Sequence, residues 1–117
     1  MYEDFTTKER WSGAEVRCQF QTIRTAVATR HADAADIKFL IQDRPVWIAL
    51  SLEALNEYRR QNSFAVSDRA AVEAAGHYLK TILESGEESG RELYSLSPAE
   101  TREHLEAVLR EAAAPAK

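Results

Sequence analysis

The chain has 117 residues, of which 44% are hydrophobic and 29% charged, and its formal net charge is -4. This length and composition are typical of one globular domain and exclude a disordered tail, a collagen-like chain and a disulfide scaffold. Apolar runs are too short for a transmembrane helix, and no signal peptide is visible. We therefore expect a single cytoplasmic domain over residues 1–117 that binds no membrane, with fraying at 1–10 and 114–117.

The charge is divided unevenly along the chain. Residues 1–66 carry nine Lys/Arg and nine Asp/Glu, whereas residues 67–117 carry six and ten. This balance argues against nucleic-acid binding, which depends on Lys and Arg that neutralise phosphates. Cys18 is the only cysteine, so one chain can form neither an internal disulfide nor a Cys-based zinc site.

Residues 13–32 fit two secondary structures. Val16, Phe20, Ile23 and Val27 follow the spacing of one helical stripe, and Ser12 and Glu15 have the spacing of a capping box. Val16, Cys18 and Phe20 also alternate as in a strand. We favour a helix, because the stripe is longer than the alternation, and the strand stays open as the alternative.

Residues 37–50 are predicted to form a β-hairpin. Ile37, Phe39 and Ile41 alternate with polar residues, and Val46, Ile48 and Leu50 alternate after Asp43-Arg44-Pro45. Pairing Ile41 with Val46, Phe39 with Ile48 and Ile37 with Leu50 places both sets on one face.

The rest of the chain predicts three helices and a strand. A short helix over 52–60 has Ser51 as its N-cap, and a longer one over 68–85 begins after Ser67 and ends at Gly86. A strand is expected at 91–96, and Ser97 and Glu100 form a capping box before the last helix. The fold class is therefore α+β: a small mostly antiparallel sheet, made of the hairpin 37–50 and the strand 91–96, packed by three to four helices.

No catalytic constellation is visible. His31, His77 and His104 have no metal-ligand spacing, and Ser51, Ser67 and Ser97 are explained as helix caps. Glu73 with His77 and Glu100 with His104 fit solvent-exposed pairs four residues apart. The sequence predicts no catalytic residue, no metal ligand and no cofactor.

Five residues are candidates for binding a partner: Trp47, Leu40, Arg17, Arg24 and Trp11. Arg10, Arg17, Arg24 and His31 recur every seven residues, so on a helix they would form one stripe. The aliphatic parts of these side chains would cover the edge of the core with their charged groups in water. Alternatively, the charged groups would bind an acidic surface, including the acidic half of a second copy. Trp47 and Leu40 lie on the second face of the hairpin, where they are core residues or interface anchors, and Trp11 allows the same two interpretations.

Residues 37–55 carry a resemblance. The hairpin followed by Leu50-Ser51-Leu52-Glu53-Ala54-Leu55 is similar to a family of small bacterial proteins of unknown function, in which an apolar hairpin runs into an Ile-Ser-x-Glu-Ala-Leu helix start. The resemblance covers about residues 37–97. It implies a bacterial cytoplasmic α+β domain and assigns no catalytic or binding residue.

Two functions are compatible with these features. The favoured hypothesis is a non-enzymatic protein-interaction or regulatory module that binds a protein partner or itself. The alternative is a small enzyme or ligand-binding protein with a pocket between sheet and helices, where His77 or His104 would work with a nearby Glu.

Overall fold

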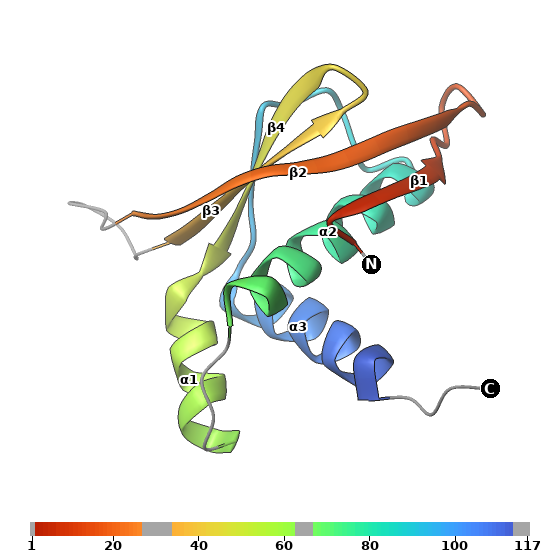
Figure 1. Ribbon diagram of the computed structural model, residues 1–117. Helices are drawn as coiled ribbons and strands as arrows, with labels where there is room; N and C mark the ends of the chain where they lie inside the picture. The colour runs from red at the N-terminus through yellow and green to blue at the C-terminus, as the bar shows by residue number, and fades with distance from the viewer. Residues whose placement is uncertain (1, 27–33, 63–66, 114–117) are drawn as a thin grey trace.

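The computed structural model describes residues 2–26, 34–62 and 67–113 (Figure 1). Five strands and three helices lie within these ranges. In chain order they are β1 (Asp4–Lys8), β2 (Glu15–Ala26), β3 (Ala34–Ile41), β4 (Arg44–Ser51), α1 (Leu52–Asn62), α2 (Asp68–Ser85), β5 (Leu93–Ser95) and α3 (Pro98–Ala113). Asp4–Lys8 of the segment 1–10 forms β1, and residues 114–117, for which fraying is also expected, lie outside the described residues.

The strands form one sheet in the order β1-β2-β3-β4-β5. Neighbouring strands are antiparallel except for β4 and β5, which are parallel. The α+β class is as predicted, but the sheet is mixed and has five strands. α2 contacts the first four strands and α3 contacts β4, so both helices cover the same face, and α1 continues beyond the end of β4 (Figure 1).

The helix predicted over 13–32 is wrong, because Glu15–Ala26 forms β2. Val16, Cys18 and Phe20 alternate inward, and a β-bulge then shifts the register between Phe20 and Thr22. The extra residue moves the next inward position to Ile23, which pairs with Ile37 on β3. A bulged strand therefore reproduces the helical spacing of Val16, Phe20 and Ile23. Val27 and His31, which completed the predicted stripes, lie outside the described residues.

The hairpin is confirmed, but its predicted register is wrong by two residues. Phe39 pairs with Val46, Ile37 with Ile48, and Ile41 with Arg44. The turn consists of two residues, and Gln42 takes a φ of 56°, the left-handed conformation that the first residue of such a turn needs. A shift of two residues keeps every side chain on its face, so the predicted apolar face is correct.

The predicted starts of the three helices are confirmed. The Ser51 hydroxyl accepts from the Ala54 N–H, and Ser67 caps α2 in the same way. Ser97 and Glu100 form the predicted capping box at the start of α3. Gly86 ends α2 with a φ of 87°.

The core lies between the inner face of the sheet and the helices. It is a cluster of apolar side chains. Its largest fully buried side chains include Phe39, Ile37, Ile48, Leu50, Leu79, Leu83 and Leu105. The hydroxyl of buried Thr101 accepts from the Ser51 N–H at 3.0 Å, which joins the end of β4 to α3. This packing leaves the opposite face of the sheet without a covering helix in the described ranges.

Candidate functional site

The outer face of the sheet brings together three of the predicted partner-binding residues. Arg24, Leu40 and Trp47 lie at outward positions of β2, β3 and β4, because the residue before each of them, Ile23, Phe39 or Val46, packs into the core. Lys38 on β3 pairs with Trp47 across the strands and shares this face. Since outward positions of adjacent strands stand side by side, these residues form one continuous surface.

Trp47 is at the centre of this surface. The Arg24 guanidinium carbon lies 4.6 Å from the centroid of the indole ring, and the Lys38 ammonium lies 5.9 Å from it. Both distances are within the range of cation–π attraction. The backbone N–H of Trp47 donates to the Glu92 carbonyl at 2.8 Å. The segment that enters β5 therefore holds the backbone that carries the indole ring.

Apolar side chains extend the surface around the half-buried indole. Leu93 on β5 pairs with Trp47 and is 48% exposed, and Pro45 pairs with Leu40 one step along the strands. We call the apolar residues Leu40, Pro45, Trp47 and Leu93, together with the cations Arg24 and Lys38, the tryptophan patch. Within the described ranges, neither cation of the patch takes part in an ion pair.

Arg17 shares the outer face but its charge is already neutralised. Its guanidinium donates to both carboxylate oxygens of Asp4, at 3.0 and 2.7 Å. These hydrogen bonds, helped by the charge of Arg17, hold the pKa of Asp4 below its usual value. The predicted arginine stripe does not exist, since β2 is a strand and Arg10 precedes it, donating its backbone N–H to the Leu83 carbonyl.

Trp11 lies apart from the tryptophan patch, in the connection between β1 and β2. Its side chain is 75% exposed, and its indole N–H donates to the Gly86 carbonyl at 2.8 Å. Glu15, Val16 and Arg17 extend β2 past its pairing with β3, so this hairpin tip projects away from β4 (Figure 1). Trp11 therefore braces the hairpin against the end of α2 and does not meet Trp47.

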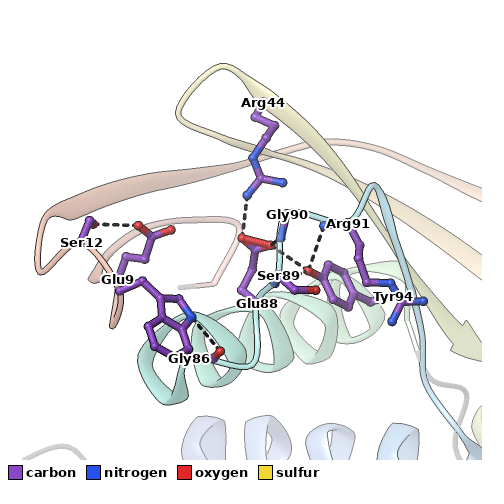
Figure 2. A network of polar contacts seen from close by, with 10 residues as sticks. Glu9, Ser12, Arg44, Gly86, Glu88, Ser89, Gly90, Arg91 and Tyr94 are labelled. Atoms are coloured by element: carbon purple, nitrogen blue, oxygen red, sulfur yellow. Dashed lines mark hydrogen bonds and ion pairs between the residues drawn. The ribbon is translucent and has the colours of Figure 1, made fainter.

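The segment between α2 and β5 is organised by a buried carboxylate. Glu88 is only 6% exposed and accepts from Arg44 at 2.8 Å, from the Gly90 N–H at 2.6 Å and from the Tyr94 hydroxyl at 2.7 Å (Figure 2). The Tyr94 oxygen in turn accepts from the Ser89 N–H at 3.0 Å. All of these hydrogen bonds of Glu88 therefore shape the turn between α2 and β5.

His77 and His104 do not form the predicted exposed pairs with glutamates. They face each other from α2 and α3, with their Nδ1 atoms 2.7 Å apart. His104 is buried, and burial lowers its pKa, with the charge of His77 acting in the same direction. Sequence reasoning missed this contact because it depends on how two helices pack, which the pattern of one helix does not contain.

A hollow of about 310 Å³ lies on the seam between α2 and α3. Among the described residues its lining comes from the two helices and the cap of α2, and it includes Ala70, Glu73, Val108 and Leu109. The alternative hypothesis expected a pocket between sheet and helices, and this hollow has a different position. In the described part of the chain, no three His, Cys, Asp or Glu residues are grouped closely enough to hold a metal ion.

Comparisons with known proteins identify no relative of this chain. No family model, curated protein or solved structure matches the chain. None of the helices in the described ranges has the length and apolar character needed to cross a bilayer.

Proposed function

We propose that the protein is a non-enzymatic interaction module whose tryptophan patch binds an acidic segment of a protein partner. The observation that carries the proposal is the position of Trp47, half-buried on an uncovered sheet face between two cations without an ion-pair partner in the described ranges. On the resemblance of residues 37–97, we propose a bacterial cytoplasm as its setting.

The chemistry of the patch favours a partner with both apolar and acidic groups. An apolar side chain placed on Trp47 and Leu93 removes aromatic and aliphatic surface from water, which is how interface anchors act. Carboxylates beside that anchor would meet Arg24 and Lys38 and fix the orientation of the bound segment. Arg17 adds little, because Asp4 already neutralises it.

A second copy of the chain fits the patch less well than another protein. Two patches stacked about a twofold axis would bring the cations of one copy against those of the other. The acidic residues of α3 could meet the patch only in a head-to-tail contact; the exposed ones are Glu100, Glu103, Glu106 and Glu111. Head-to-tail contacts that do not close into a ring produce filaments. We therefore expect a monomer that binds a different protein.

The fluorescence of Trp47 provides a direct test. Trp11→Phe leaves Trp47 as the only indole, and this variant is titrated at low salt with synthetic Glu-rich peptides that each carry one Leu or Phe. We expect a saturable change in emission. Arg24→Glu and Lys38→Glu should each weaken binding about tenfold, which corresponds to roughly 1.4 kcal/mol.

Arg69→Glu is the matched control. It makes the same change of charge at an exposed position of α2, and binding should be unchanged. The proposal fails if no peptide changes the Trp47 emission, or if Arg24→Glu and Arg69→Glu affect binding equally. It also fails if sedimentation shows a dimer that buries Trp47, since the patch would then be a self-association surface.

A further inference from the structure

The contact between His77 and His104 depends on protonation. A neutral imidazole carries one N–H and one acceptor nitrogen, whereas an imidazolium has a hydrogen on both nitrogens. The Nδ1 atoms lie 2.7 Å apart and the ring centroids 5.0 Å apart. At this distance one Nδ1 donates and the other accepts, so the contact tolerates at most one charged ring. A second proton replaces the hydrogen bond with repulsion between two cations.

Aromatic rings enclose the pair and keep it partly dry. The Tyr2 ring meets His77 edge to face, with centroids 5.4 Å apart, and the Tyr78 ring meets His104 in the same way at 5.3 Å. The Tyr2 hydroxyl donates to Glu111 on α3, and burial together with Glu111 raises the pKa of Tyr2 to about 12. Tyr2 therefore stays neutral over the pH range in which His104 titrates.

Carboxylates surround the pair at a greater distance and do not replace the contact. Glu100 and Glu103 on α3 act to raise the pKa of His104, but burial outweighs them. The charged groups on the packed elements are Glu73, Lys80 and Glu84 on α2, Glu100, Glu103 and Glu111 on α3, and the pair of Arg102 with Glu57 of α1. Lys80 is paired with Glu84 at 3.3 Å, and Glu84 also accepts from Thr7 of β1.

We propose that the His77–His104 contact is a pH-sensitive latch between α2 and α3, closed when at most one ring is charged and opened by the second proton. The hollow on the α2–α3 seam begins one turn away, because Glu73 precedes His77 by one turn and Val108 follows His104 by one turn. Opening the latch loosens this seam and widens the hollow, while the tryptophan patch on the opposite side of the sheet is unaffected.

The expected pH dependence follows from the lowered pKa of His104. Below the ordinary histidine pKa of 6.5, the unfolded chain binds more protons at this position than the folded chain does. Stability from this contact is therefore complete above pH 6.5 and is lost as the pH falls from there through the lowered pKa of His104. Loss of one hydrogen bond raises the unfolding equilibrium constant about fivefold.

His104→Asn provides the decisive variant. The asparagine amide can occupy the position of the ring Nδ1 and keep a hydrogen bond to His77, but it does not titrate. Denaturant unfolding is measured at pH 7.5 and pH 5.5 for the wild type, His104→Asn and His31→Asn. We expect the wild type and His31→Asn to lose stability between these pH values and His104→Asn to lose much less. If His104 only fills space, His104→Asn should change the stability by the same amount at pH 7.5 and at pH 5.5.

An NMR titration of the imidazole protons in the wild type keeps the test independent of how well the variant folds. The latch predicts that the His104 ring takes up its proton below the ordinary histidine pKa, and that this step is accompanied by changes in residues along the α2–α3 seam. The proposal is overturned if the His104 ring titrates at the ordinary histidine pKa without any change along the seam. It is equally overturned if His104→Asn retains the wild-type loss of stability between pH 7.5 and pH 5.5.

Discussion

At the residue scale, the most connected polar group of the described residues is the buried Glu88–Tyr94 pair. The Tyr94 hydroxyl donates to Glu88 and accepts from the Ser89 and Arg91 N–H groups, at 3.0 and 3.3 Å. Arg44 completes the arrangement from β4 (Figure 2). One phenolic oxygen thus holds together the segment that leads into β5, and β5 in turn supports the backbone of Trp47.

We predict that Tyr94→Phe lowers the free energy of unfolding by about 1–3 kcal/mol, because it leaves a buried carboxylate and two partly buried N–H groups without their partner. Tyr78→Phe is the matched control: it removes the same atom from a neighbouring ring, 6.3 Å away, that forms no hydrogen bond recorded in the described ranges. Chemical denaturation compares the two. Equal losses for both variants would show that the Tyr94 hydroxyl has no special role.

At the element scale, α2 contacts the N-terminal segment unusually closely. A Cβ added at Gly76 would overlap the Tyr2 carbonyl oxygen and lie 2.6 Å from Tyr2 Cβ. Tyr2 is also held by its backbone N–H, which donates to Glu73 at 2.5 Å. Gly76 therefore allows the chain before β1 to pack directly on the middle of the helix, beside His77.

We predict that Gly76→Ala destabilises the protein by about 1–2 kcal/mol, because the clash exceeds the roughly 1 kcal/mol that alanine contributes to helix propensity. In a chain that begins at Glu3 the clash is absent, and the same substitution should become stabilising. Thermal unfolding is measured for the full chain and for the chain that begins at Glu3, each with and without Gly76→Ala. Comparison of the two effects of the substitution shows whether its sign reverses. A loss of stability in both backgrounds would show that the helix interior, and not Tyr2, requires the glycine.

The elements also show how far local patterns can predict this fold. Caps at Ser51, Ser67 and Ser97 were predictable because a cap and its helix are a few residues apart. The bulge after Phe20 was not, since one extra residue gives a strand the spacing of a helix. The outward position of Leu40 and Trp47 followed from alternation alone, whereas the approach of Arg24 to Trp47 required the correct structure for β2.

At the scale of the whole molecule, the tryptophan patch lies on the sheet layer and the α2–α3 seam lies in the helical layer. The sheet presents the tryptophan patch outward, and its inner face supports the helices that carry the histidine pair and the α2–α3 seam. A change at the seam therefore need not alter the patch. Loss of α2–α3 packing at mildly acidic pH should leave peptide binding to Trp47 intact, as long as the sheet remains folded.

A second, more acidic pH region belongs to the contact between β1 and α2. Thr7 is buried and donates to Glu84, and this hydrogen bond, together with Lys80, lowers the pKa of Glu84 below its ordinary value of 4.5. The unfolded chain therefore binds more protons at Glu84 below that pH. Stability from this contact is complete above pH 4.5 and is lost as the pH falls through the lowered pKa.

We predict that Thr7→Val, which keeps the shape of the buried side chain, reduces the loss of stability below pH 4.5 and leaves the loss between pH 7.5 and 5.5 unchanged. His104→Asn should do the opposite, because it removes the titration of residue 104 and leaves the contact of Thr7 with Glu84 unchanged. Denaturant midpoints measured in small pH steps from 7.5 to 3 distinguish the two regions. If Thr7→Val also reduced the loss of stability between pH 7.5 and 5.5, the Thr7–Glu84 and His77–His104 contacts would be coupled. Their contributions to stability could then not be separated by pH.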